Sequence, residues 1–501
     1  MRDRHGRRDT DGAHYVKNHS MNVVDLPSEI LADILSECDT RVASETCKTF
    51  ASVVHSMSWL WTSVRIHPHQ YTLSGPQLLG ARLSRAKCAP LDVTISCVLE
   101  NTVGVSALCK VLAEYNAQIR HFELTAQHAM VAGAVVQYVF PGTAEAYPAL
   151  EVLSVLSKRE GDSEEYELPR LDKVLSHAAT QFPNVRKLHI NSFYDSVPVP
   201  PLSSTPFTVL TTLILDGALE DDIPAPGLLA ALLNGTPGLE TLWIKHHFWE
   251  NFDDVSQPTA YGSYKGRSNV SLDIQLPRLK HLAVSVPGTA CELMGCITAP
   301  ALEDLHLDGS RGPHWSETER PEFEWDDWAT GSVQRALKLF AARSKSVRRF
   351  AVTRAYLTQT GWEWVLFGEE GGRGPPFPQL ECIALHGMFE YANELWSGFD
   401  DELLERFASS PRIPLRRLVL MYCEFPLHAS SVVGAFRASK AQGQKELECD
   451  DYVPLWEEDG EDWAELEELG VSVLCKEGTE VVEDLWWVSG HGIDGTDSSR
   501  Y

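Results

Sequence analysis

The sequence of 501 residues predicts an α/β fold: a small N-terminal helical module followed by a solenoid, with a curved parallel sheet and helices on its convex side. Three observations lead to this prediction. One apolar pattern recurs ten times between residues 119 and 420, a proline precedes six of the copies, and a short amphipathic stretch stands ahead of them. A chain of this length also exceeds what one ordinary core accommodates, so a repeat array or several domains is expected.

The recurring pattern is apolar-x-x-apolar-x-apolar, and successive copies begin 23 to 45 residues apart. Alternating apolar residues within each copy are typical of a strand that buries one face. A lone strand cannot bury that face, whereas stacked neighbours in a parallel sheet can, which is why such units occur in arrays. The copies begin at Ile119, Leu150, Val185, Leu210, Leu239, Leu279, Leu302, Val347, Leu380 and Leu415.

Proline stands two residues before six of these copies, where it ends a preceding helix and extends the residues that follow. The six are Pro148, Pro183, Pro237, Pro277, Pro300 and Pro378. Apolar runs between the copies predict helices at 228–233, 333–342 and 403–408. Two polar stretches, 249–271 and 309–330, interrupt the spacing and are interpreted as extended loops.

A short helix is predicted ahead of the array, beginning at Pro27, because the missing N–H of proline costs nothing in the first turn of a helix. Ile30, Leu31, Ile34 and Leu35 follow at helical spacing and form one apolar stripe. A module this small cannot form a large core, so a partner helix would cover its surplus apolar surface. The alternative is that the stripe packs on the first repeat as an N-terminal cap.

Segment 24–61 contains Leu26-Pro27-x-Glu29-Ile30-Leu31-x-x-Ile34-Leu35, then Cys47-Lys48-x-Phe50, then Leu60-Trp61. With these residues in this order, the segment resembles an F-box. Between Cys38 and Cys47 the chain is about one helical turn shorter than the family motif. The resemblance implies docking on a Skp-type adaptor of a cullin-RING ubiquitin ligase, through Leu26, Pro27, Ile30, Leu31, Ile34 and Leu35.

Two further segments carry a resemblance. Residues 66–95 are similar to fungal F-box proteins, whose Leu-Trp pair precedes a strand, a helix and a second strand, here Pro90-Leu91-Asp92-Val93-Thr94-Ile95. Residues 119–420 resemble an irregular leucine-rich repeat, in which only the copy at Leu415 is completed by a later cysteine, Cys423. The resemblances imply the substrate-recognition subunit of a ubiquitin ligase, with ubiquitin transfer on other subunits. The alternative is a leucine-rich-repeat interaction scaffold whose N-terminal segment is only a structural cap.

The surface expected to bind a target protein is the concave face of the sheet, toward which the residues between the apolar positions point. Mixed charge together with Trp and Arg is typical of a protein-binding surface. An ordinary solvated sheet face is the alternative interpretation. The predicted contacts are Trp243, Lys245, His306, Asp308, Arg349 and Arg417.

Several classes of protein are disfavoured. The formal net charge of -27 argues against nucleic-acid binding through a general basic surface. No apolar run approaches the roughly 20 residues of a membrane span, and residues 1–20 do not resemble a secretory signal. Eleven scattered cysteines without a Cys-x-x-Cys pair indicate reduced thiols and a cytoplasmic or nuclear location. Motif searches give no catalytic residue, cofactor site or metal site.

The predicted organisation has six segments. They are a disordered leader at 1–22, the F-box-like motif at 23–64, a connecting strand-helix segment at 65–118, the solenoid at 119–440, an acidic cap at 441–488 with a last strand at 471–474, and a disordered tail at 489–501. Residues 441–501 hold 18 acidic residues against Lys445, Lys476 and Arg500. A polar cap is expected there because an exposed sheet edge must be covered or made polar.

Overall fold

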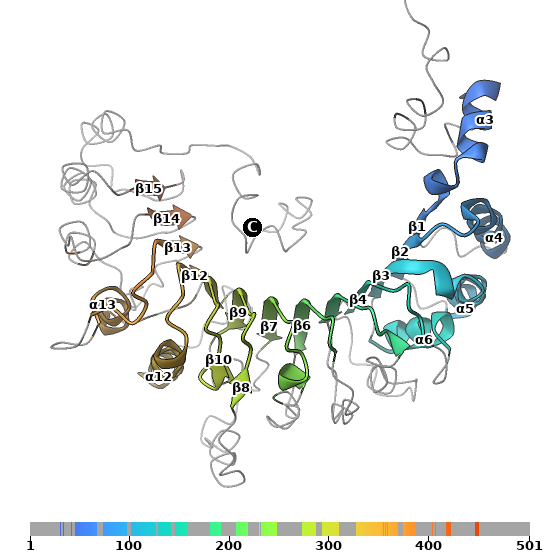
Figure 1. Ribbon diagram of the computed structural model, residues 1–501. Helices are drawn as coiled ribbons and strands as arrows, with labels where there is room; N and C mark the ends of the chain where they lie inside the picture. The colour runs from blue at the N-terminus through green and yellow to red at the C-terminus, as the bar shows by residue number, and fades with distance from the viewer. Residues whose placement is uncertain are drawn as a thin grey trace, which may run out of the picture.

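The protein forms an arc built on one long parallel sheet (Figure 1). The computed structural model describes residues 31, 34, 42, 46–67, 74–97, 102–126, 129–141, 146–157, 181–191, 207–218, 230, 232–247, 273–286, 293–309, 327–353, 355, 357, 359–368, 374–386, 403, 406, 417–421 and 446–449. Within these residues, thirteen strands lie side by side in nearly sequential order, and all neighbouring pairs are parallel. The predicted parallel sheet is therefore confirmed.

The strands of this sheet begin ahead of the repeated pattern and continue past it. They are β1 Ser63–Ile66, β2 Leu91–Cys97, β3 Ile119–Ala126, β4 Val152–Ser157, β5 Lys187–Asn191, β6 Thr212–Ala218, β7 Thr241–His247, β9 His281–Ser285, β11 Asp304–Asp308, β12 Arg349–Thr353, β13 Cys382–His386, β14 Arg417–Met421 and β15 Glu446–Cys449. A separate two-stranded parallel sheet pairs β8 Ile274–Gln275 with β10 Ile297–Thr298.

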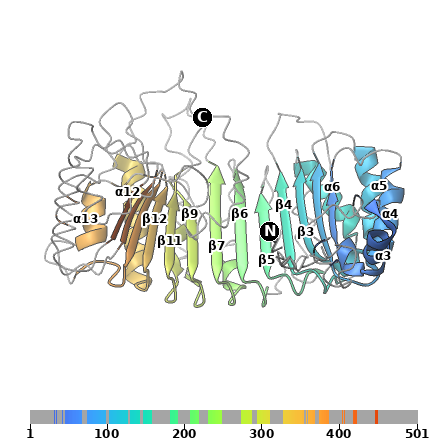
Figure 2. The same cartoon turned by 90° about the horizontal axis from the view of Figure 1, so that it is seen from above.

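Helices lie on the outer side of the arc, and the strands line its inner side (Figures 1 and 2). The helices are α3 Lys48–Ser56, α4 Gly75–Ala86, α5 Thr102–Ala113, α6 Ala129–Val139, α12 Asp327–Arg343 and α13 Gln359–Phe367, with 3-10 turns η2 Ser58–Trp61 and η4 Asn116–Gln118. Because a helix is wider than a strand, helices on one face force the sheet to curve away from them.

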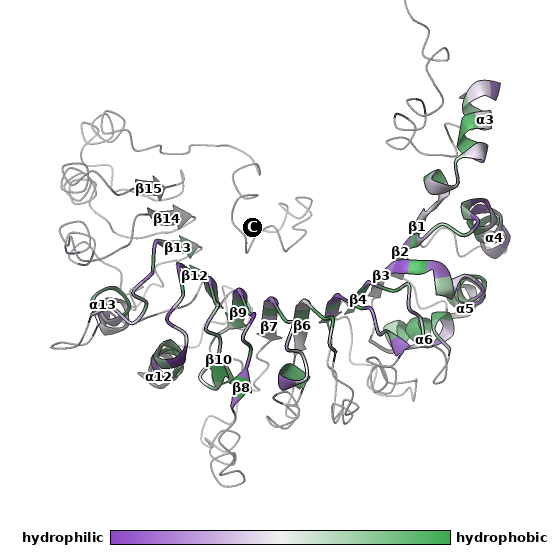
Figure 3. Ribbon diagram, viewed as in Figure 1, coloured by the Kyte–Doolittle hydropathy of each residue, from purple (hydrophilic) through white to green (hydrophobic). Residues whose placement is uncertain are grey.

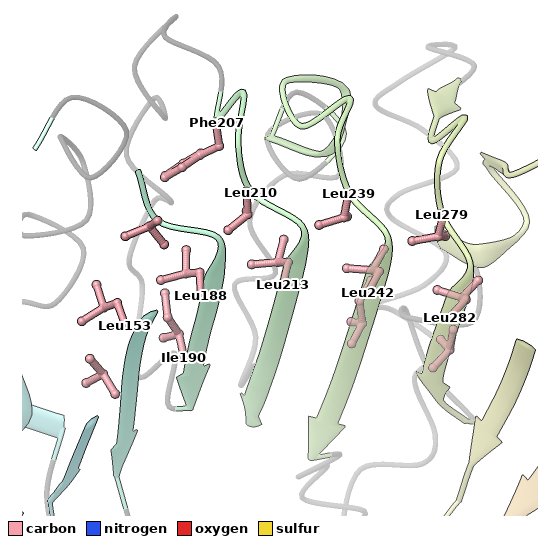
Figure 4. Close-up of a cluster of buried hydrophobic side chains, with 14 of the residues drawn as sticks. Leu153, Leu188, Ile190, Phe207, Leu210, Leu213, Leu239, Leu242, Leu279 and Leu282 are labelled. Carbon is pink, nitrogen blue, oxygen red and sulfur yellow. The ribbon is translucent and has the colours of Figure 1, made fainter. Parts of the chain in front are cut away.

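The core lies between the sheet and these helices. All ten copies of the apolar pattern run into a strand, and the side chains that repeat from strand to strand stack in rows (Figure 4). Leu188, Leu213, Leu242 and Leu282 form one such row, and each is at least nine-tenths buried. Stacking gives every strand an apolar neighbour on both sides, so the pattern needs no disulfide to hold it.

Hydrophobic helix faces close the core from the convex side. The helix α6, green along much of its length in Figure 3, buries Val131, Val135, Val136 and Val139. The ring of Phe140, which directly follows this helix, packs edge-on against three aromatic rings: Phe122 at 5.2 Å, Tyr147 at 5.0 Å and Phe182 at 5.4 Å between centroids. Aromatic rings from β3, from the end of α6 and from the turns ahead of β4 and β5 therefore meet in one cluster.

Some expected boundaries differ from the sheet that is observed. The connecting segment at 65–118 supplies half of β1 and all of β2. These two strands pair with each other and β2 pairs with β3, so the sheet passes residue 119 without a break. Strand β15 was not predicted. Of the predicted helices, 333–342 lies inside α12, and the described residues at 230, 232, 233, 403 and 406 are helical.

Other expectations fall outside the described residues: the leader at 1–22, the loop at 249–271, most of the loop at 309–330, the strand at 471–474 and the tail at 489–501. Residues 327–330 of the second loop are helical, because α12 begins at Asp327, so the loop prediction is wrong at that end. Among the helices that the structure does describe, none combines the length and apolar character that crossing a bilayer requires.

Candidate binding surfaces

The predicted adaptor-binding stripe is described at two of its six positions. Leu31 and Ile34 are both helical, as expected. Leu31 is buried in the continuous core, whereas Ile34 is 45% exposed. Leu26, Pro27, Ile30 and Leu35 lie outside the described residues. The core therefore covers one of these two neighbouring side chains and leaves the other largely in solvent.

Trp61 attaches the N-terminal module to the rest of the molecule. Its indole Nε1 donates a hydrogen bond of 2.7 Å to the carbonyl of Val54 in α3. The ring of His55 stacks on it at 5.9 Å between centroids, and the Arg85 guanidinium from α4 lies 4.5 Å from the ring centroid. Leu60 is buried beside it. Together, these contacts join α3, η2 and α4 into one packed end of the array.

Large apolar side chains that remain exposed concentrate at this end. Seven such side chains occur among the described residues, and four of them lie between positions 34 and 78. The four are Ile34 at 45%, Val42 at 62%, Trp59 at 43% and Leu78 at 66% exposed. Single exposed apolar residues are ordinary on a protein surface, but a local concentration of them is typical of an interaction site.

The second candidate surface is the concave face of the sheet. Side chains alternate along each strand, so the residues between the buried leucines form rows that run from strand to strand across this face. From β2 to β14, the central row consists of Thr94, Glu123, Ser154, His189, Ile214, Trp243, Ala283, His306, Ala351, Ala384 and Val419.

The predicted target contacts all lie on strands at concave positions, but three of them are buried. Trp243 and His306 belong to the central row and are 3% and 5% exposed, and Asp308 is 7% exposed. These three side chains are not accessible in the structure described, and their contact with a target protein stays a prediction. Arg349 is accessible, and Lys245 and Arg417 are placed by strand register alone.

Arg349 takes part in a charged network that the pattern of residue types did not indicate. The Asp304 carboxylate has no solvent-exposed surface and lies between two neighbouring strands. Arg349 from β12 contacts both of its oxygens through Nε and Nη2, and His281 from β9 contacts it through Nδ1. A buried carboxylate needs such partners, because an uncompensated charge in the interior is costly.

Two further polar contacts follow the same face. His306 lies with Nε2 2.9 Å from the Thr353 hydroxyl on the next strand. At the N-terminal end, Arg120 donates to both oxygens of Asp92, at 3.2 Å and 3.0 Å from Nη2. Pairs of this kind join neighbouring strands, so they tie adjacent repeats together.

The titration of three groups responds to their surroundings. Burial raises the pKa of the Cys109 thiol to about 12, with a smaller contribution from the neighbouring Cys97. The hydrogen bond from Lys280 lowers the pKa of Glu240, and the same bond raises the pKa of Lys280. A thiol with so high a pKa is a poor nucleophile at neutral pH, which assigns Cys109 to the core.

Metal binding has no support in the described part of the chain, where no group of three or more His, Cys, Asp or Glu side chains is placed to hold an ion. Among the described residues, these two surfaces present exposed apolar side chains near the N-terminal end and a sheet face that changes from polar to apolar along the arc. Comparison with known proteins identifies no family for this chain. No family model matches it, and a search of curated proteins finds no match.

Proposed function

We propose that this protein is the substrate-recognition subunit of a cullin-RING ubiquitin ligase, with an F-box that docks on a Skp-type adaptor and a leucine-rich-repeat solenoid that binds a target protein. The observation that carries the proposal is the concentration of exposed apolar side chains in the F-box-like module. Ubiquitin transfer belongs to other subunits, and this chain contributes proximity between target and ligase.

The module has the two-sided character that an adaptor-binding element requires. Leu31, Leu60 and Trp61 are buried and fix it to the array. Ile34, Val42 and Trp59 stay at least 43% exposed on the same module. An amphipathic helix from a partner would cover these side chains, over an interface of order 1,600 Å² in total.

Target binding is proposed for the part of the concave face that is accessible without rearrangement. On β2, β3 and β5 this face carries partly or fully exposed polar side chains, among them Thr94, His121, Glu123 and Lys187. Polar and charged groups of both signs favour a specific protein partner over a general anionic or cationic one.

Capture of a purified Skp-type adaptor tests the proposal. We expect the full chain to bind it, and the Ile34→Asp, Val42→Asp double variant to bind at least about tenfold more weakly, a loss of about 1.4 kcal/mol. Leu339→Asp is the matched control, because Leu339 is 49% exposed on α12, far along the arc. Equal capture of the double variant and the control would contradict adaptor docking.

The rival proposal is an interaction scaffold in which the N-terminal module is only a cap, and the burial of Leu31 favours it. It predicts that Leu26→Asp with Ile30→Asp lowers thermal stability and leaves every partner unchanged. Under adaptor docking, the adaptor is lost from the proteins captured with that variant.

A further inference from the structure

The N-terminal end of the arc is rich in basic residues, although the chain as a whole is strongly acidic. The chain has 70 Asp and Glu residues against 43 Lys and Arg, yet the sequence from 46 to 91 contains no Asp or Glu at all. The same stretch contains five basic residues, namely Lys48, Arg65, Arg82, Arg85 and Lys87. This end therefore has a local charge opposite in sign to that of the whole molecule.

Three of these basic residues lie on the helices that form the N-terminal end of the arc (Figure 1). Lys48 is the first residue of α3, Arg85 lies in the last turn of α4, and Lys87 follows α4 directly. All three are exposed. Arg65 is exposed as well, but it pairs in register with Thr94 and so lies on the concave face of the sheet.

The Trp61 ring holds basic side chains from both helices in place. The guanidinium of Arg85 lies 4.5 Å from the ring centroid, and the His55 ring from α3 stacks on the same indole with 3° between the planes. Lys48 precedes His55 by seven residues, which is about two turns along the exposed side of α3. Because Trp61 is buried, these groups are positioned before a partner arrives, which lowers the cost of ordering them.

An exposed leucine adjoins these charges. Leu78 is 66% exposed, more than any other large apolar side chain in the described part of the chain. It precedes Arg85 by seven residues on α4, so the two share one stripe of that helix. Leu79 and Leu83 of the same helix are buried. The stripe next to them therefore presents an apolar side chain and a cation to solvent.

We propose that the surface formed by Lys48, His55, Leu78, Arg85 and Lys87 binds an acidic protein segment in which an apolar residue stands among Asp or Glu residues. Carboxylates suit the guanidinium and ammonium groups, and the apolar residue covers the exposed leucine. A nucleic acid or an anionic membrane fits less well, because a chain with a net charge of -27 repels an extended polyanion. This inference goes beyond the proposed function and does not depend on adaptor docking, whose test uses other side chains.

Fluorescence anisotropy of a labelled peptide, four repeats of Glu-Glu-Leu, tests the surface in the full chain. At low salt we expect it to bind at least about tenfold more tightly than four repeats of Gln-Gln-Leu. Most of this difference should disappear in 1 M NaCl, where the screening length is about 3 Å. Equal binding of the two peptides overturns the proposal, as does no binding at low salt, which would mean that acidic groups of the chain already neutralise this surface. Tighter binding of single-stranded oligothymidylate or of phosphatidylserine vesicles would also overturn it.

Charge reversal locates the binding site. We expect Lys48→Glu with Arg85→Glu to weaken binding of the Glu-Glu-Leu peptide at least about tenfold. Arg335→Glu with Lys338→Glu is the matched control, because both residues are exposed on α12 and Lys338 lies over the ring of a tryptophan. The two double variants change the net charge equally, so equal weakening in both would show a response to net charge alone and would overturn the proposal.

Cations near the C-terminus of a helix also stabilise it, so the stability of each variant is measured separately from binding. Hydrogen exchange of the α3 and α4 amides reports whether these helices stay folded. Leu78→Ser leaves every charge in place and removes a side chain that is mostly in solvent, and it should weaken peptide binding severalfold with the same exchange. Unchanged affinity in this variant would overturn the assignment of α4 to the binding surface.

Discussion

At the scale of single residues, Asp304 shows how this sheet tolerates a buried charge at a concave position. Its carboxylate is fully buried, whereas the Arg349 side chain that pairs with it is 41% exposed. The two partners therefore differ in their access to solvent. Arg349 can find water if the carboxylate is removed, but Asp304 cannot leave its site if the guanidinium is removed.

This asymmetry predicts that Arg349→Met destabilises the array more than Asp304→Asn does. We expect a loss of about 3 kcal/mol for the first, which leaves a buried carboxylate with the His281 ring as its remaining side-chain contact, and about 1 kcal/mol for the second. Hydrogen exchange of the β9, β11 and β12 amides gives the local opening free energy of each variant. If Asp304→Asn costs as much as Arg349→Met, the carboxylate itself stabilises the sheet.

At the scale of strands, a second regularity emerges at the residue that directly follows the first apolar position of each repeat. These residues stack on one another, since the amide of each donates to the carbonyl of the one before at 2.7–2.9 Å. Their charges alternate along the sheet with a single neutral step: Arg120, Glu151, Arg186, Thr211, Glu240, Lys280, Glu303, Arg348 and Glu381. Away from Thr211, each charge in this row thus has opposite charges as its neighbours, as the 2.8 Å pair of Lys280 and Glu240 illustrates.

The alternation predicts that Glu303→Lys is destabilising, because it places a third positive charge between those of Lys280 and Arg348. We expect a loss of about 0.5–1 kcal/mol at low salt, measured by hydrogen exchange of β9, β11 and β12. The difference should shrink in 1 M NaCl, where the screening length is about 3 Å. Glu303→Gln removes the negative charge without introducing a positive one, so it should cause a smaller loss of stability. Equal losses in the two variants would show that the alternation of charge does not stabilise the sheet.

The strands were predictable because their signal is periodic and their burial is shared by every repeat. The ten apolar patterns located ten strands, whereas β15, Glu446–Cys449, is four residues long, half of them acidic, and carries no such pattern. The candidate sites were less predictable. Periodicity places Trp243 on the concave face but cannot say whether something lies over it, and helical spacing puts Leu31 and Ile34 on one stripe without telling which of them the core covers.

At the scale of the whole molecule, one core runs from Leu31 to Leu403 without a division into domains among the described residues. Its contacts are nevertheless local, because each strand touches only the strands and helices of adjacent repeats. Stability in such an array is approximately a sum over repeats and the interfaces between them. A continuous core and local energetics are therefore compatible, and the arc need not unfold as one unit.

This locality predicts that Phe350→Ala loosens only the C-terminal part of the arc. Phe350 is 1% exposed and packs against Trp362 and Phe377, with centroids at 6.0 Å and 6.3 Å, so its removal should cost about 3–5 kcal/mol. We expect faster hydrogen exchange in β11, β12, β13 and α13, and unchanged exchange in β1–β3. Phe122→Ala removes a ring of the same size from β3, where Phe122 packs against Phe140. This variant should give the opposite pattern, with faster exchange in β1–β3 and unchanged exchange in β11, β12, β13 and α13. Uniform loss of protection along the sheet in both variants would instead mean that the thirteen strands unfold together, as one unit rather than repeat by repeat.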